Sequence, residues 1–360
     1  MYVLLLVSVI ATLLTYLEGN NKLKGGMKWG FLIVVLTAAI RDNYGNDFDS
    51  YLDWFTQVTK SNLNIFQIMS DKAIFGVDNG WSLLNYFFVP FGFNFFIAFI
   101  TLITGIIYYS FIKNNVEPKW RWLAVFIYLF SSQFFVLGLS MMRQSFAMAL
   151  FVLSYSFIKD QKYIVAVCIM LFATTIHTSA LITLPFIFLN MKKDWNHKLL
   201  STLLILIYFG FIVVARYTTD ILNQIFFLSS FERFSDNYSE NVIEFNLGIG
   251  YIVMQLPFLL YVVYAWRNKI SNNQAVAILM SSIPYFLLAF KDVAMSERLG
   301  YYFAVFSIIT LPFVFSSINK RIIRLALLLI YAVVTIYSYN MFFTSPIWTE
   351  KFFVYHTIFG

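Results

Sequence analysis

The sequence predicts an all-α, polytopic integral membrane protein. Of its 360 residues, 60% are hydrophobic and only 12% are charged, and the mean hydropathy is +0.74. Soluble domains carry about 25% charged residues, so this chain cannot cover a water-facing surface. The apolar residues also come in runs close to the roughly 20 residues that cross a bilayer. These observations exclude a soluble enzyme, a nucleic-acid-binding protein and a disordered scaffold, and they make membrane lipid an expected partner.

The apolar runs divide the chain into about 11 to 12 predicted transmembrane helices, depending on whether residues 163–190 count once or twice. The segments are 1–17, 27–41, 92–112, 121–140, 141–158, 163–190, 199–216, 247–266, 273–290, 299–318 and 322–341. The first has no basic start and no small-residue cleavage site, so we expect a retained helix and not a signal peptide. No internal repeat or linker is visible. We therefore expect one integral membrane domain over residues 1–360.

The loop charges predict the orientation. Basic residues collect in cytoplasmic loops, and the short loops at 18–28, 113–121 and 159–162 are rich in lysine and arginine. Segment 41–80 carries six aspartates, which suits the outside. The later basic loops fall inside only if residues 163–190 enter the membrane and return, so we predict a short helical hairpin with its tip near His177. A single long tilted helix remains the alternative.

A hairpin of this length has its tip below the outer surface. Non-helical backbone at that depth is tolerated only when it is buried in protein or lines a water-filled cavity. We therefore predict a cavity on the outer side of the membrane. The outer-face segments 41–91 and 217–246 are expected to contribute to it.

Several ionisable residues interrupt the apolar runs at this outer level. An ionised group at the bilayer centre costs about 2.5–3.5 kcal/mol by insertion scales, so such groups are usually buried and functional. Each residue also has a structural alternative, such as snorkelling for Arg216 or a hydrogen bond from His177 to Thr174 or Ser179. Their convergence from different helices favours a site. The residues are Arg143, His177, Arg216, Glu297 and Arg298.

Segment 41–91 is expected to contain an amphipathic helix. Phe48, Tyr51, Leu52 and Phe55 recur at helical spacing, and Tyr51 with Trp54 would anchor the helix at the headgroups. A short apolar helix follows and ends near Pro90 and Gly92. The polar face of the first helix carries carboxylates, which a solvated surface would also explain.

Sequence patterns for cofactors are missing. The single cysteine, Cys168, and the three histidines argue against a metal site, and no Walker motif or HExxH pair is found. We therefore expect no metal and no cofactor.

Five blocks, taken in order, resemble the EpsG-like branch of bacterial exopolysaccharide and O-antigen polymerases, also called Wzy-like. Each block alone is a weak signal, and the order and spacing of all five carry the resemblance. The blocks are Arg41 with Gly45-Asn46-Asp47-Phe48-Asp49-Ser50-Tyr51, then Gly80-Trp81-Ser82-Leu83-Leu84-Asn85, Arg143-Gln144-Ser145-Phe146-Ala147, the stretch from Ala173 through His177 to Leu181, and Arg298-Leu299-Gly300-Tyr301-Tyr302-Phe303.

The resemblance implies a metal-independent glycosyltransferase that polymerises undecaprenyl-diphosphate-linked oligosaccharide repeat units of O-antigen, capsule or exopolysaccharide. Donor and acceptor are both lipid-linked, and undecaprenyl diphosphate is the leaving group. The enzyme would work in the bacterial inner membrane with its active site facing the periplasm or outside. The fold would be GT-C-like in the broad sense, with a chain-length regulator protein as a partner.

The chemistry assigns roles to the candidate residues. Arginines suit the developing charge of a diphosphate, and a histidine or carboxylate suits the general base. We expect diphosphate binding by Arg143, Arg298, Arg41 and Arg216, a catalytic role for His177, Asp47 or Glu297, and sugar or acceptor contacts by Asp49, Tyr51, Gln144 and Tyr301. His177 could equally bind phosphate. A flippase or other transporter of lipid-linked oligosaccharides, or a membrane-bound acyltransferase, remains an alternative function.

Overall fold

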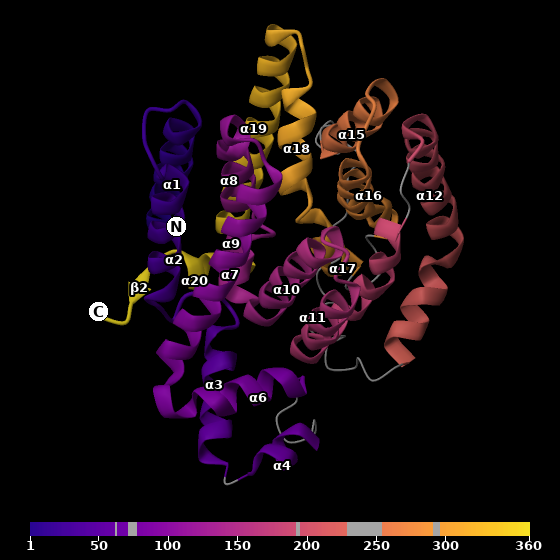
Figure 1. The fold of residues 1–360 in the computed structure, drawn as a ribbon. Coiled ribbons are helices and arrows are strands. Elements are labelled where there is room, and N and C mark those ends of the chain that lie inside the picture. Colours follow the sequence, from indigo (N-terminus) through magenta and orange to yellow (C-terminus); the bar gives the residue numbers. More distant parts are fainter. Residues whose placement is uncertain (62, 71–77, 192–194, 229–253, 291–295) are drawn as a thin grey trace. The chain divides into compact units, whose positions relative to one another are not determined.

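The computed structural model describes residues 1–61, 63–70, 78–191, 195–228, 254–290 and 296–360. Almost all of this part is helical, which confirms the all-α polytopic fold (Figure 1). The chain forms two compact units. Unit 1 comprises Met1–Phe188 and Thr335–Gly360, and unit 2 comprises Leu189–Val334. The single membrane domain stays a prediction.

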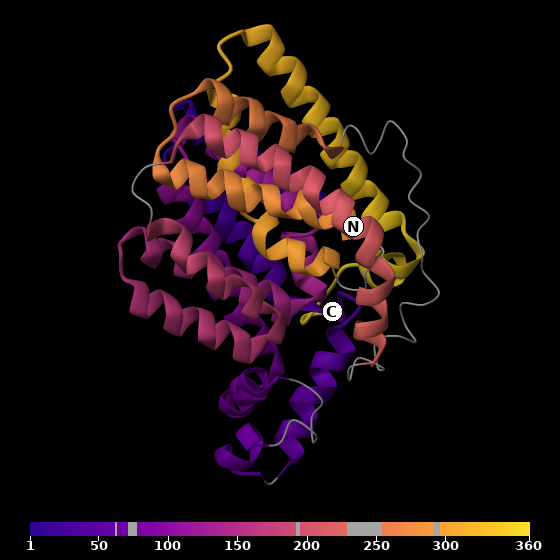
Figure 2. The same ribbon diagram turned by 90° about the vertical axis from the view of Figure 1, so that its right-hand side faces the viewer.

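Unit 1 contains most of the sequence blocks. Its elements are α1 (Tyr2–Gly19), α2 (Gly26–Ala39), β1 (Arg41–Asp42), α3 (Phe48–Lys60), α4 (Ile65–Ser70), α6 (Asn79–Phe88), η1 (Val89–Phe91), α7 (Phe93–Asn115), η2 (Pro118–Trp120), α8 (Arg121–Phe130), α9 (Phe135–Ser140), α10 (Met142–Lys159), α11 (Tyr163–Ile176), α20 (Pro346–Phe352) and β2 (His356–Thr357). Helix α2 packs on α1 and α7, and α10 packs on α7 and α11. Figure 2 shows α10 and α11, in magenta, running along each other.

Unit 2 is a second helical group. Its elements are α12 (His197–Leu228), α15 (Leu256–Arg267), α16 (Asn272–Leu287), η4 (Leu288–Phe290), α17 (Ser296–Ala304) and α18 (Ser307–Ser316). Helix α12 packs on α15 and α16, and α16 packs on α17 and α18. The connecting elements η3 (Thr178–Met191) and α19 (Arg321–Thr344) contribute residues to both units.

Five described helices are long and apolar enough to cross a membrane, and six if the bent pair α17–α18 counts as one. The five are Tyr2–Gly19, Phe93–Asn115, His197–Thr218, Asn272–Phe290 and Arg321–Thr344. Of the other predicted segments, 141–158 forms one continuous helix, α10, that is less apolar than these five, while 27–41 is shorter and 121–140 divides into α8 and α9. The total of 11 to 12 spans stays a prediction. Residues 229–253, which hold most of segment 217–246 and the start of 247–266, lie outside the described residues.

The helical structure is interrupted at His177, where the tip of the hairpin was expected. Helix α11 ends at Ile176, and His177 has extended backbone angles (φ −150°, ψ 112°). The narrower 3₁₀ helix η3 follows and contains Pro185, which lacks the amide hydrogen of a regular helix. Within residues 163–191, α11 and η3 do not pack along each other. The break is confirmed, but the two arms do not form a packed hairpin.

The amphipathic helix is confirmed as α3. It buries Phe48, Tyr51, Phe55 and Val58, whereas Leu52 is exposed. Tyr51 is only 3% exposed, so it packs inward and does not serve as a headgroup anchor. The short apolar helix is confirmed as α6 with η1, which contains Pro90 and ends at Gly92.

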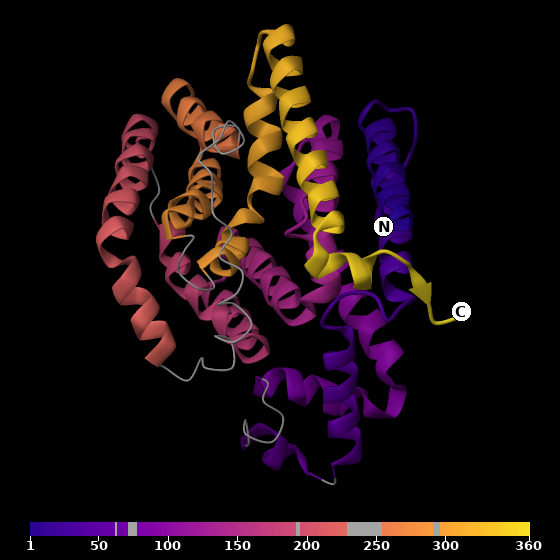
Figure 3. The ribbon, with the colours of Figure 1, turned by 180° about the vertical axis from the view of Figure 1, so that it is seen from behind.

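The C-terminal segment packs against the first sequence block. Strands β1 and β2 pair antiparallel, with Arg41 opposite Thr357. The Ile358 amide donates to the Ile40 carbonyl at 3.0 Å, and the Gly45 amide donates to the Lys351 carbonyl at 3.2 Å. Figure 3 shows the yellow C-terminal strand beside the indigo N-terminal helices. Residues from the two ends of the chain therefore form one local structure.

Gly80 allows α6 to approach α11. A Cβ atom there would lie 2.2 Å from Thr175 Oγ1 and 2.7 Å from the Thr175 carbonyl oxygen. Because a backbone atom is involved, rotation of the threonine side chain cannot relieve the clash. We expect Gly80→Ala to destabilise the protein by about 1–3 kcal/mol, as overpacking usually does.

The melting temperature of the detergent-solubilised protein measures this effect. Gly210→Ala in α12 is the matched control, since a Cβ there meets no atom within 4 Å. A melting temperature of Gly80→Ala equal to that of the control would contradict the close approach.

Candidate functional site

Arg143 lies at the centre of a polar and aromatic cluster in unit 1. The break between α9 and α10 at Met141 places Arg143 in the first turn of α10. Its Nη1 atom forms an ion pair with Asp78 Oδ2 at 3.3 Å, and its Cζ atom lies 4.8 Å from the centre of the Trp54 ring. The guanidinium is thus held at one edge by a carboxylate and at one face by an indole. The Arg143 side chain remains 20% exposed, so a ligand can reach it.

Tyr51 lies on the protein side of this cluster. Its hydroxyl accepts a long hydrogen bond from the Arg143 amide at 3.4 Å, and its ring packs against Trp54 and Trp81. Burial, reinforced by the Asp47 carboxylate, raises the pKa of Tyr51 to about 12. The phenol therefore stays protonated at neutral pH.

The first block reaches the cluster through a tight backbone contact. Gly45 has φ +107°, and a Cβ atom there would lie 2.8 Å from the Leu139 carbonyl oxygen. Only glycine fits both conditions easily. Two residues later, the Asp47 amide donates to Ser140 Oγ at 3.3 Å. Asp47 is therefore placed beside the chain break that precedes Arg143.

Asp49 is placed differently. Its carboxylate is exposed and accepts a hydrogen bond from Lys351 Nζ at 2.7 Å, and the same ammonium donates to Asn43 Oδ1 at 3.0 Å. The carboxylate thus ties α3 to α20. A sugar contact by Asp49 stays a prediction.

The His177 segment is connected to Arg143 through side chains. The Thr178 hydroxyl donates to Asp78 Oδ1, while Asp78 Oδ2 holds Arg143. The half-buried His177 is hydrogen-bonded through Nδ1 to Ser179 Oγ at 2.6 Å. Of its two expected partners, the structure thus shows Ser179. Arg143 is therefore tied through Asp78 to Thr178, the residue that directly follows His177.

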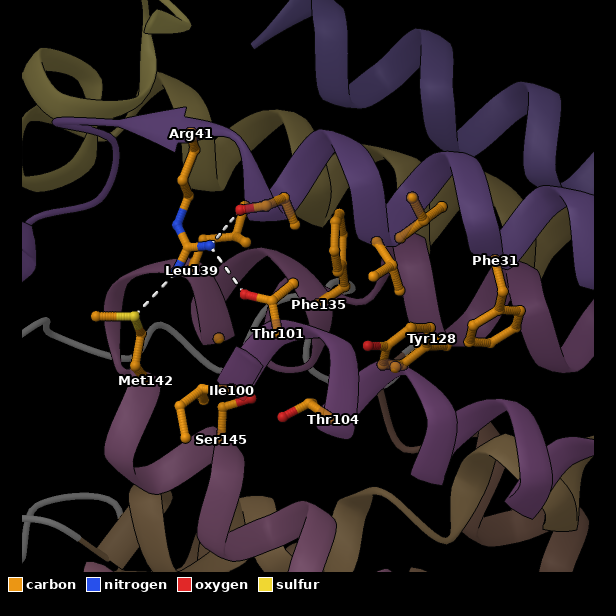
Figure 4. Close-up of a pocket in the computed structure, with 15 residues that line it drawn as sticks. Phe31, Arg41, Ile100, Thr101, Thr104, Tyr128, Phe135, Leu139, Met142 and Ser145 are labelled. Carbon is orange, nitrogen blue, oxygen red and sulfur yellow. Dashed lines mark hydrogen bonds between the residues drawn. The ribbon is translucent and has the colours of Figure 1, made fainter. Parts of the chain in front are cut away.

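Arg41 lies inside the helical packing (Figure 4). It is 2% exposed and donates to the Ala38 carbonyl, to Thr101 Oγ1 at 3.2 Å and to Met142 Sδ at 2.9 Å. It borders a cavity of about 40 Å³, which has room for about three water molecules. The cavity is also lined by Thr104, Tyr128 and Ser145. These contacts link the end of α2 to α7 and to the first residue of α10, and diphosphate binding by Arg41 stays a prediction.

A model of the EpsG family matches residues 28–357. The chain belongs to the EpsG family. The resemblance read from the five blocks is thereby confirmed, and the match also includes the C-terminal segment that packs on the first block. No curated protein and no solved structure matches the chain. Family membership indicates a membrane protein of polysaccharide biosynthesis.

The remaining predicted residues of this EpsG-family chain are less accessible or belong to unit 2. Gln144 is 2% exposed. Arg216 is exposed on α12, and Arg298 is half-buried on α17. The Tyr301 hydroxyl donates to Glu297 Oε1 at 2.9 Å, one helical turn away. The proposed roles of these residues stay predictions.

Sequence reasoning missed three members of the cluster around Arg143. Asp78 was counted only among the acidic residues of an outer segment, Trp54 was read as a headgroup anchor, and Thr178 was not considered. Asp78 directly precedes α6, which is a usual place for a helix cap, yet its side chain makes no capping hydrogen bond. Its position before the Gly80 block was the one available signal.

Among the described residues, no group of three or more histidine, cysteine, aspartate or glutamate side chains is arranged to hold a metal ion. The cluster around Arg143 instead offers a guanidinium, a carboxylate, hydroxyls and aromatic faces. Metal independence of this EpsG-family protein stays a prediction.

Proposed function

We propose that this EpsG-family protein polymerises oligosaccharide repeat units carried on undecaprenyl diphosphate, at the outer face of the bacterial inner membrane. The observation that carries the proposal is the fixed, partly exposed guanidinium of Arg143 beside aromatic and hydroxyl side chains. In the reaction, the bond between the anomeric carbon and the phosphate oxygen breaks. An acceptor hydroxyl oxygen forms the new bond to that carbon, and its proton passes to a base.

Arg143 suits the leaving group. Negative charge grows on the diphosphate as the bond breaks, and a preorganised cation stabilises that charge without rearranging during the reaction. The ion pair with Asp78 uses Nη1, which leaves Nη2 to a phosphate oxygen. A guanidinium can hold phosphate through two parallel hydrogen bonds, which also fixes its orientation.

The aromatic side chains suit a sugar. Trp54 lies next to the guanidinium and is half-buried, whereas Tyr51 is almost completely buried. Sugar rings present C–H faces that pack on aromatic rings, and Trp54 offers such a surface. The sugar joined to the diphosphate would therefore meet this part of the cluster.

His177 is the first candidate for the base. When Nδ1 carries the proton and donates a hydrogen bond to Ser179 Oγ, Nε2 is the basic nitrogen. Asp47 is the second candidate, because its carboxylate is near enough to raise the pKa of Tyr51. The two candidates lie on different elements, so substitutions can separate them.

Reconstitution with a chelator tests the proposal. Purified protein in liposomes should convert lipid-linked repeat units into a ladder of longer chains in excess EDTA, because fixed side chains supply the positive charge. Gel separation of the released glycans measures the chain length. Loss of elongation that divalent metal restores would contradict a metal-free site. Movement of lipid-linked units across the bilayer without elongation would support a transporter instead.

A further inference from the structure

The starts of three helical elements meet at the Asp78 carboxylate. Asp78 directly precedes α6, Arg143 lies in the first turn of α10, and Thr178 begins η3. The two carboxylate oxygens divide their contacts, with Oδ2 paired to Arg143 and Oδ1 accepting from Thr178. The carboxylate is only 17% exposed. One side chain thus joins the starts of three elements that are far apart in the sequence.

The carboxylate is directed away from its own helix. An aspartate at this position normally accepts from an amide of the first helical turn, but Asp78 makes no such hydrogen bond. Both of its oxygens are instead used by the Arg143 cluster. The Asp78 side chain thus orients an arginine and does not cap its own helix.

We infer that Asp78 is a positioning residue: it aims the Arg143 guanidinium and offsets part of its charge while that cation holds a lipid diphosphate. This inference rests on the proposed function. Through Thr178, the same carboxylate fixes the start of η3 relative to Arg143 and so sets the distance between His177 and the leaving group.

The position of Asp78 argues against a role as the base. In an in-line displacement, the acceptor hydroxyl approaches the anomeric carbon from the side opposite the leaving group. A carboxylate 3.3 Å from the guanidinium that holds the diphosphate lies on the leaving-group side. Asp78 therefore acts through Arg143 and not on the acceptor.

Removing this charge should change binding and turnover in opposite directions. A carboxylate beside Arg143 repels an incoming diphosphate, so a neutral group there should strengthen binding of the ground state. Without the carboxylate, the guanidinium is less well aimed, and small misplacements of a catalytic group can lower the rate by about 100-fold. A residue with a merely structural role would weaken binding and turnover together.

The test uses Asp78→Asn, which keeps the size and removes the charge. Binding of a short polyprenyl diphosphate to the full-length protein and elongation of lipid-linked units are both measured. We expect turnover to fall at least about tenfold while the dissociation constant stays equal or falls. Asp53→Asn is the control, because Asp53 is exposed on the neighbouring α3 and also carries one negative charge. The control should match the wild type in both measurements.

Thr178→Val provides a second variant that leaves the ion pair in place. It should lower turnover without strengthening diphosphate binding, since the carboxylate still offsets the charge of Arg143. If Asp78→Asn fails to fold, this variant decides the matter: unchanged turnover in Thr178→Val would overturn the inference. A folded Asp78→Asn protein with turnover within twofold of the wild type, or with weaker binding of the diphosphate, would also overturn it.

A separate variant, Arg143→Ala, tests the proposed function itself. If Arg143→Ala keeps normal binding and elongation, the diphosphate site itself is wrong. If Arg143→Ala is inactive while Asp78→Asn behaves like the wild type, the diphosphate site stands and only the role of Asp78 is rejected.

Discussion

Arg143→Ala should abolish polymer and leave single repeat units on the lipid carrier, at an unchanged protein level. The substitution removes the cation that meets the leaving diphosphate, and loss of one preorganised donor typically lowers turnover by about 100- to 1,000-fold. Arg143→Lys should rescue poorly, because an ammonium has no planar fork. A lysine cannot pair with Asp78, lie over Trp54 and still bind phosphate through two hydrogen bonds.

Gel profiles of lipid-linked glycans in a deletion strain measure this effect, with an immunoblot for protein level. Arg121→Ala is the matched control. Arg121 also faces a carboxylate, since its Nη1 lies 3.8 Å from Glu18 Oε1, but it is not part of the cluster. Polymer of normal length from Arg143→Ala would remove this arginine from the site.

The second large effect is expected for His177→Ala. If His177 is the base, turnover should fall by orders of magnitude while the affinity for substrate barely changes, because proton transfer occurs only in the transition state. Ser179→Ala should cause a smaller loss of the same kind, since it removes the hydrogen bond that orients the ring. Steady-state kinetics on lipid-linked units separates the two quantities.

A different result would move the role elsewhere. A parallel loss of affinity in His177→Ala would indicate that the histidine binds phosphate. Activity in His177→Gln together with inactivity in Asp47→Asn would assign the base to Asp47. His197→Ala is the control, since that ring contacts the backbone carbonyl of Ala265 in unit 2.

The sequence predicted the parts of the molecule that depend on local pattern. The apolar runs identified the helical class, the spacing of Phe48, Tyr51 and Phe55 identified α3, and the apolar stretch before Pro90 identified α6. The interruption near His177 was instead predicted from the distribution of basic residues among the loops. The helical class, α3 and α6 depend on neighbours within a few turns of helix.

Pairings between distant residues could not be predicted in this way. Asp78 and Arg143 are 65 positions apart, and no local pattern links them. The inward direction of Arg41 depends on Thr101 and Met142, which lie on other helices. The division of segment 121–140 was also missed. Averaged hydropathy does not register the change of direction around Ser131, where α8 ends in extended backbone.

The pairing of β1 with β2 has a consequence for biogenesis. Ile40 and Gly45 receive their hydrogen-bond partners from Ile358 and Lys351, which the ribosome makes much later than the first block. During synthesis, residues 40–47 therefore lack these backbone hydrogen bonds until the C-terminal segment has been made. Formation of the early helices and completion of the first block are then separate events. A premature stop after residue 345 would leave an inserted protein whose first block has lost its closing strand.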